Sequence, residues 1–224
     1  MNAATSSSPT RATTHYIAKP RPGTTRLWTI QPLWVWERLR EQQMLWSDPT
    51  GAAFFQDFQD PYDWMRDQMH RRLPGYEGRY PWWAYDYKPD LRRYKPGAGQ
   101  MVRLELAVPP ERVLLSSYGA WHYVLNLWYL PHSVVDEEHA RESNAWEEEL
   151  ERHGLYPFSG RWPPGPWQSR MVASWERIFD VDDLRETNTI QACFECLDFA
   201  DVVRVTFFTP RLREQGDKEN CKLK

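Results

Sequence analysis

Short alternating runs of apolar residues are separated by stretches in which the apolar positions recur every three or four residues. The alternation predicts strands, and the helical spacing predicts helices. Strands are predicted at residues 26–31, 82–87, 101–108, 113–116, 189–196 and 202–208, and helices from Pro32, from Pro61, at 119–129, at 133–152 and in SWERIF (174–179). This order favours an α+β fold, in which helices flank a mixed, mainly antiparallel sheet.

The length of 224 residues suits a single domain with tails. We expect residues 1–25, rich in Ser, Thr, Ala and Pro, to be a disordered tail, residues 26–210 to be the α+β domain, and residues 211–224 to be a polar tail. No run of 18 apolar residues predicts a membrane helix, and the N-terminus has no apolar core of a secretory signal. We therefore expect a cytoplasmic protein.

Aromatic residues are unusually frequent: 13 Trp, 11 Tyr and 9 Phe in a chain with a mean hydropathy of -0.75. Such aromatic residues in a polar background suggest a ligand pocket within the core. The net charge of -3 argues against a general nucleic-acid binder but permits a local basic face.

The cysteines and the recognised motifs indicate no cofactor. Cys193 and Cys196 have a C-x-x-C spacing, but their flanks predict a strand, which favours ordinary buried thiols over a redox or zinc site. No Walker loop, G-x-G-x-x-G or zinc constellation is present, so neither a cofactor nor a metal is expected.

Polar residues on predicted strands are the first candidates for a site. Gln31 and Gln191 either satisfy each other and nearby backbone or line a pocket. Glu195 alternates with Gln191 along one strand face, so it is either a general base, a partner for a cationic substrate or an exposed residue. Asp86 offers a second carboxylate at the end of a strand.

His122 lies near the start of an apolar helix and is a candidate acid or base, although a hydrogen-bonded core histidine fits equally well. Ser116 precedes it by six residues and would be a nucleophile if the two paired, but no G-x-S-x-G motif surrounds it. Asn126 follows His122 by one helical turn and shares its face.

Nine basic residues and four acidic ones lie between residues 66 and 103, interleaved with Tyr and Trp. This pattern suits a phosphate backbone with stacked bases, and it also suits a solvated loop. The candidates for binding RNA are Arg71, Arg72, Arg79, Lys88, Arg92, Arg93 and Lys95.

Several pieces in a fixed order, LWTIQ, YDWM, YPWWAY, VLLSSYGAWHYVLNLWYLP, SWERIF and IQACFE, resemble an uncharacterised bacterial and fungal domain family. They cover the chain from residue 26 to residue 208. Fungal members of this kind resemble the arginine-containing cyclodipeptide synthases, which join two aminoacyl groups from aminoacyl-tRNAs into a cyclo-arginyl diketopiperazine, a secondary metabolite.

The resemblance implies an ATP-independent transferase whose partners are arginyl-tRNA and a second aminoacyl-tRNA, and the basic residues would take the tRNA. It assigns no catalytic residues. From the residue patterns, we expect catalysis from Asp86, Ser116, His122 and Glu195, and substrate binding by Trp28, Thr29, Gln31, Trp83, Tyr85, Trp121, Asn126, Trp175, Glu176 and Gln191.

Two other hypotheses about the function remain open. The segment QACFECLDFADVVRV resembles the last strand of ADP-ribosyltransferases, with Thr29 in a first-strand motif, although the expected His or Arg on that strand is absent. Alternatively, the domain is an RNA-binding module without catalytic activity.

Overall fold

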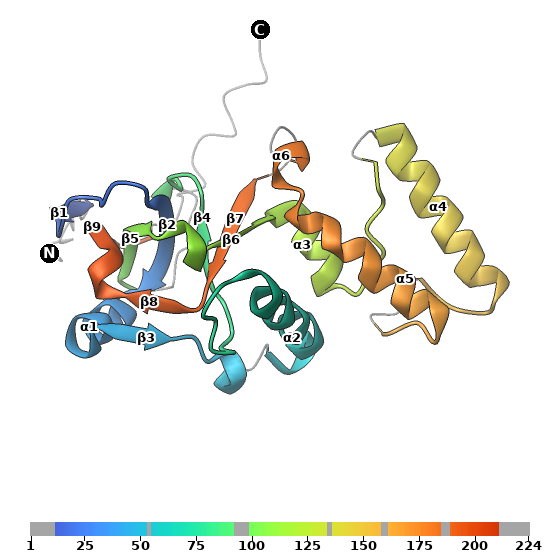
Figure 1. Cartoon of the computed structure of the whole chain (residues 1–224), viewed down its shortest axis with the longest axis horizontal. Coiled ribbons are helices and arrows are strands. Elements are labelled where there is room, and N and C mark those ends of the chain that lie inside the picture. The colour runs from blue at the N-terminus through green and yellow to red at the C-terminus, as the bar shows by residue number, and fades with distance from the viewer. Residues whose placement is uncertain are drawn as a thin grey trace, which may run out of the picture.

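The computed structural model describes residues 12–52, 55–91, 99–133, 136–157, 161–184 and 189–210. A seven-stranded sheet in the order β1-β9-β5-β2-β4-β7-β6 is the centre of the fold, and each of its pairings is antiparallel. Its strands are β1 (Thr13–Tyr16), β2 (Thr25–Pro32), β4 (Trp82–Tyr85), β5 (Met101–Val108), β6 (Leu114–Ser117), β7 (Ile190–Phe194) and β9 (Val202–Phe208). This arrangement confirms the predicted α+β class (Figure 1).

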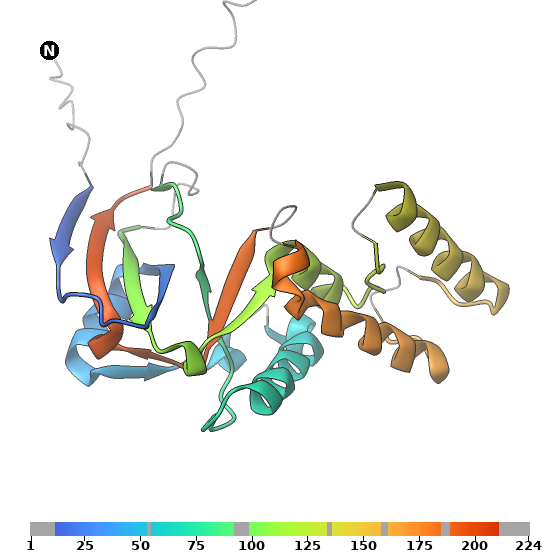
Figure 2. The same ribbon diagram turned by 45° about the horizontal axis from the view of Figure 1, so that its top comes forward.

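Helices surround this sheet, and a two-stranded ribbon joins it. The α-helices are α1 (Leu33–Gln42), α2 (Phe55–Arg72), α3 (Tyr118–Leu125), α4 (Asp136–Arg152), α5 (Pro166–Trp175) and α6 (Val181–Leu184). Short 3-10 turns occupy Pro49–Gly51, Pro110–Arg112, Glu176–Phe179 and Phe199–Asp201, and the ribbon pairs β3 (Met44–Trp46) with β8 (Cys196–Asp198). Figure 2 shows α4 and α5 projecting from the sheet on the side of α3.

The hydrophobic core has two main parts, on opposite faces of the sheet. On one face, Val35, Trp36 and Leu39 of α1 pack on strand residues such as Leu27 and Leu104. On the other face, α2, α3 and α5 cover the strands at the β6 end, where Leu114 and Cys193 point toward them. Alternate residues of a strand point to opposite faces, so one sheet supplies both cores. Each half of the sheet is thus covered mainly on one side.

Several predicted boundaries were wrong. The expected tail at residues 1–25 contains β1, which pairs with β9 through four residues, while residues 1–11 and 211–224 lie outside the described part. The predicted strand 189–196 bends at Glu195, which separates β7 from β8. Helix α2 begins at Phe55, so Pro61 lies inside the helix and does not open it, and the Phe55 ring packs edge-on against Tyr62 and Tyr80 at 5.8 and 5.1 Å.

Trp175 is a core residue of the helical half. It is fully buried, its indole N–H donates to the carbonyl of Trp128 at 2.7 Å, and its ring meets the rings of Trp64 and Trp162 at 5.5 and 5.6 Å. A buried carbonyl without its donor is costly, so this indole does more than fill space.

We predict that Trp175→Phe lowers the free energy of unfolding by about 2–4 kcal/mol, through the lost hydrogen bond and the lost indole volume. The matched control is Trp34→Phe on α1, where the side chain is 55% exposed, and it should change stability by less than about 0.5 kcal/mol. Urea unfolding of both variants measures the difference; equal losses would contradict this role for Trp175.

Candidate functional site

Strands β2 and β4 share fewer paired positions than any other neighbouring strands of the sheet. Strand β2 shares eight paired positions with β5 but only one, Trp28 with Tyr85, with β4. Beyond that pair, the Thr29 hydroxyl donates to the carbonyl of Trp83 at 2.9 Å, and Gln31 Nε2 donates to the Thr29 hydroxyl at 2.8 Å. Side chains therefore replace the missing part of the backbone ladder, because a buried carbonyl needs a donor.

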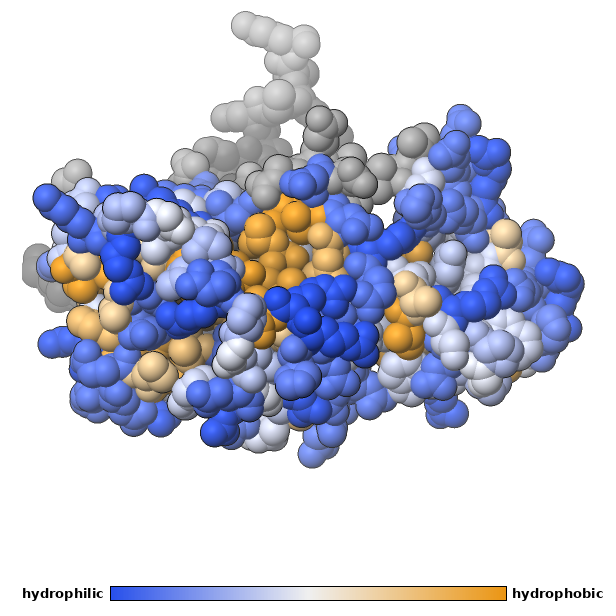
Figure 3. Space-filling model, viewed as in Figure 1, coloured by the Kyte–Doolittle hydropathy of each residue, from blue (hydrophilic) through white to orange (hydrophobic). Residues whose placement is uncertain are grey.

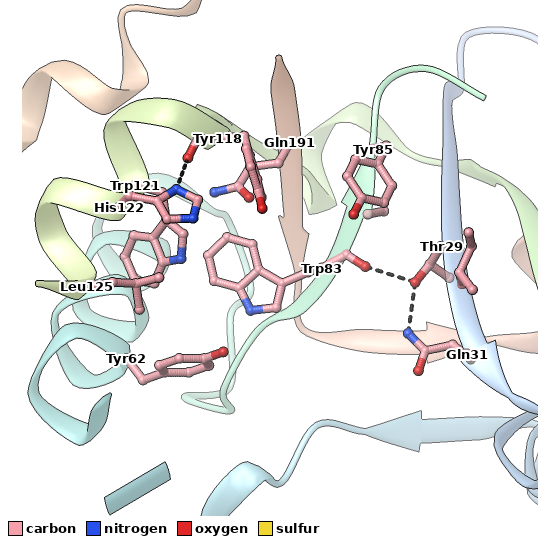
Figure 4. Close-up of a pocket in the computed structure, with 12 residues that line it drawn as sticks. Thr29, Gln31, Tyr62, Trp83, Tyr85, Tyr118, Trp121, His122, Leu125 and Gln191 are labelled. Atoms are coloured by element: carbon pink, nitrogen blue, oxygen red, sulfur yellow. Dashed lines mark hydrogen bonds between the residues drawn. The ribbon is translucent and has the colours of Figure 1, made fainter. Parts of the chain in front are cut away.

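A pocket of about 290 Å³ lies at this break (Figure 4). Its walls come from β2, β4 and β7 of the sheet and from α2 and α3, and Figure 4 shows the aromatic side chains of α2, α3 and β4 gathered around one space. The lining residues are Thr29, Ile30, Gln31, Tyr62, Trp83, Ala84, Tyr85, Tyr118, Trp121, His122, Leu125 and Gln191.

Three aromatic rings form the wall beneath the helices. Trp83 and Trp121 lie 5.0 Å apart between ring centroids, and Tyr62 meets them edge-on at 6.2 and 6.1 Å. Burial raises the pKa of Tyr62, and the nearby Trp83 indole opposes only part of this, so the hydroxyl stays protonated at neutral pH. The wall is apolar and offers ring faces that attract cations.

The two glutamines do not bond to each other. Gln191 is almost fully buried and its Nε2 donates to the Ser116 hydroxyl at 3.3 Å, while Gln31 donates to Thr29. Each amide thus turns its N–H₂ toward the protein, and its carbonyl oxygen is the end that a ligand can meet. Both amides are acceptors for a ligand that carries N–H donors.

His122 is held by its own helix. Its Nδ1 lies 2.8 Å from the carbonyl of Tyr118, one turn earlier, and a carbonyl can only accept, so Nδ1 carries the hydrogen in the neutral ring. Nε2 is then the nitrogen that can take a proton. The ring also packs edge-on against Tyr118 at 4.7 Å, which fixes its direction at the pocket rim (Figure 4).

The structure brings half of the expected catalytic and substrate-binding residues together. These are Thr29, Gln31, Trp83, Tyr85, Trp121, His122 and Gln191. Five lining residues were not predicted from the sequence: Ile30, Tyr62, Ala84, Tyr118 and Leu125. Tyr118 and Leu125 lie within the same motif as His122, and Tyr62 opens the YDWM motif, but only tertiary packing brings α2 against β4.

The other three expected catalytic groups do not line the pocket. The Glu195 carboxylate accepts hydrogen bonds from the backbone N–H groups of Glu77, at 2.8 and 3.0 Å, and of Arg79, at 3.0 Å. Ser116 is fully buried beneath Gln191, so no substrate reaches its hydroxyl, and the expected Ser–His pair does not form. Asp86 follows Tyr85 at the end of β4, where its backbone N–H donates to Ile190.

Four expected substrate-binding residues also lie elsewhere. Trp28 is the register partner of Tyr85, and the Arg26 guanidinium lies 5.9 Å from its ring. Asn126 caps α3 by donating to the carbonyl of His122 at 2.7 Å. Trp175 lies in the core, as described above. Glu176 forms ion pairs with Arg72 and Arg71 of α2, at 2.5 and 3.6 Å.

The expected RNA-binding residues do not form one strip among those described. Arg72 and Arg71 at the end of α2 are the two partners of Glu176, and the Arg79 guanidinium lies 5.6 Å from the Trp46 ring. Lys88 follows β4, close enough to Arg103 that like charge lowers its pKa. Arg92, Arg93 and Lys95 lie outside the described residues.

Cys193 and Cys196 are both free and buried, as the sequence predicted, and burial raises the pKa of each thiol. Within the described ranges, no cluster of three or more His, Cys, Asp or Glu side chains is arranged to hold a metal ion. Over the same ranges, no helix is both long and apolar enough to cross a membrane.

The fold and the site define an α+β domain with an aromatic pocket at a break in its sheet. A model of the DUF3841 family, a domain of unknown function, matches residues 26–197. The chain belongs to this family, which confirms the expected membership of an uncharacterised domain family. Neither a curated protein nor a solved structure matches the chain.

We predict that Thr29→Val destabilises the protein by about 1–3 kcal/mol, because the Trp83 carbonyl loses its donor and Gln31 loses its acceptor. Thr25→Val, at the half-buried start of the same strand, is the control for the change of residue type. Chemical denaturation compares the two. If both variants were equally stable, the hydroxyl would not be holding the break closed.

Proposed function

We propose that the protein is an aminoacyl-tRNA-dependent cyclodipeptide synthase that makes a cyclo-arginyl diketopiperazine. The observation that supports this best is the composition of the pocket: five Tyr and Trp side chains, two amide oxygens and an imidazole. A guanidinium has five N–H donors and packs well on aromatic faces, so an arginyl side chain matches these groups.

The size of the pocket suits a single aminoacyl group, the arginyl group, and the second aminoacyl group would lie outside it. About 290 Å³ is near the lower end of small-molecule pockets. The wall of Tyr62, Trp83 and Trp121 would hold the stem and guanidinium, and the oxygens of Gln31 and Gln191 would accept its N–H groups. Binding of this kind mainly positions a reactive ester, which is the contribution that this reaction needs most.

The chemistry needs only a base and a positioned ester. In the first step the α-amine of one aminoacyl group attacks the ester carbonyl of the other; a C–N bond forms, the ester C–O bond breaks, and the proton of the amine passes to the departing ribose oxygen. The second step repeats this within the dipeptidyl ester and closes the ring. His122 Nε2 at the pocket rim would take the proton and return it.

The buried position of Ser116 favours direct transfer over an acyl-enzyme on that residue. The aminoacyl ester already carries the activation that the reaction requires, so no nucleotide hydrolysis enters the scheme. Both steps release a tRNA hydroxyl, and neither changes an oxidation state.

Incubation of the pure protein with arginyl-tRNA and a second aminoacyl-tRNA should release a cyclo-arginyl dipeptide, detected by mass spectrometry. Absence of such a product with every pairing of arginyl-tRNA would overturn the proposal. Two parallel measurements identify the alternatives: thermal stabilisation by NAD would point to an ADP-ribosyltransferase-like enzyme, and tRNA binding without product would point to an RNA-binding module.

We predict that His122→Gln lowers kcat about 10²- to 10⁴-fold, the usual contribution of a general base. His153→Gln is a matched control, because His153 also places Nδ1 2.8 Å from a carbonyl one helical turn earlier, that of Glu149 on α4. Steady-state kinetics should show wild-type rates for His153→Gln. An unchanged rate in His122→Gln would remove this residue from the scheme.

A further inference from the structure

One row of side chains crosses the whole sheet on a single face. Directly paired residues of neighbouring antiparallel strands point to the same side. The pairs link Tyr16 to Arg204, Arg204 to Glu105, Glu105 to Trp28, Trp28 to Tyr85, Tyr85 to Gln191 and Gln191 to Ser116. Polar and aromatic groups therefore continue from the buried end of the sheet, through the pocket, to β9 and β1.

A basic residue lies on the strand next to the pocket wall. Ile30 lines the pocket, and its register partner on β5 is Arg103. Neighbouring strands lie about 5 Å apart, so the Arg103 side chain starts beside the pocket and on the same face as Ile30. Arg103 is half-buried and donates from Nη1 to the carbonyl of Pro89 at 2.9 Å, which holds it there.

Further basic side chains surround Arg103. Arg204 is 24% exposed, donates to the Tyr16 hydroxyl at 2.6 Å and lies 3.6 Å from Glu105, which also accepts from Arg26. Lys88 is exposed and lies close enough to Arg103 and Arg204 to feel their charge.

The positive charge is only partly balanced. Arg26 and Arg204 pair with Glu105, and the charge of Asp90 acts on Arg103, whereas Lys88 interacts with the like charges of Arg103 and Arg204. The pKa of Arg103 is lowered by burial and then by Arg204, and that of Lys88 mainly by Arg103. Cations that disfavour one another in this way are stabilised by a bound anion.

The row begins on strands that the helices cover and continues toward β9, which these helices do not cover. Figure 3 shows an apolar patch near the centre of the visible surface, and Val113 and Leu115 pack against the core that α1 covers. Thr29 and Gln31 reach the pocket from the α1 face, where they pair with Leu104 and Val102, so the pocket takes side chains from both faces at the break, whereas the cations lie on the face of the row.

We propose that Arg103, Lys88 and Arg204 form a phosphate subsite adjoining the pocket, and that it binds the phosphate of the terminal nucleotide whose acyl group occupies the pocket. This inference rests on the proposed function, because that function places an aminoacyl nucleotide there. In this subsite the phosphate contacts Arg103 and Arg204, which lie on strands. The sequence had instead predicted that loop residues near Lys88 bind the tRNA.

The test compares adenosine with adenosine 5′-monophosphate (AMP), the nucleotide that ends every tRNA, by isothermal titration calorimetry. AMP should bind the wild-type protein about tenfold more tightly than adenosine, since charge-assisted hydrogen bonds to phosphate are strong. Arg103→Gln and Lys88→Gln should remove most of this difference and leave adenosine binding unchanged, and each should weaken the salt dependence of AMP binding, because salt screens the charge attraction that the variant loses.

The control is Arg141→Gln on α4, where the side chain is 74% exposed, and it should bind AMP as the wild type does. Failure of AMP to bind more tightly than adenosine, or an unchanged preference in Arg103→Gln, would overturn the subsite. Inorganic phosphate binding as tightly as AMP would show a free-anion site and overturn the link to the pocket. A preference for AMP that the variants lose, without diketopiperazine from the wild type, would retain the subsite and overturn only the proposed function.

Discussion

The carbonyl of Trp83 has to find a hydrogen-bond donor in a place where the backbone ladder is broken, and the site follows from how that need is met. Strand β4 leaves β2 after a single paired position, and the Thr29 hydroxyl supplies the donor instead. Because a side chain spans the gap, the two strands stay joined without closing together. The space between them becomes a pocket, whereas a continuous ladder would have left a flat sheet.

The division of the core explains why that pocket is lined as it is. Helix α1 covers one face, while α2, α3 and α5 cover the other face at the opposite end of the sheet. At the edge of the region that α2 and α3 cover, aromatic rings from these helices contact β4. The polar side chains of the strands continue beyond that edge. A ligand here would meet apolar rings on one side and hydrogen-bonding groups on the other, which is a common design of small-molecule sites.

His122 illustrates how local and tertiary effects combine in the proposed reaction. Its hydrogen bond to the preceding helical turn is local, and it leaves Nε2 as the proton acceptor. Its surroundings are tertiary: Trp83 on β4 and Trp121 on the same helix as His122 form the wall of the pocket beside it. Glu195 shows the reverse: a carboxylate that suggested chemistry instead fixes a loop through two backbone N–H groups.

The sequence by itself determined the elements whose period was clear and whose ends were marked, such as β5 and the start of α1 after Pro32. It also found half of the site, because Thr29, Trp83 and His122 lie in short motifs of mixed aromatic and polar residues. Only the tertiary structure decided which motifs meet, and it brought in Tyr62 from α2 and buried Trp175 and Ser116. The physical reason is that periodicity fixes which face of an element a residue occupies, whereas strand order and register fix what that face contacts.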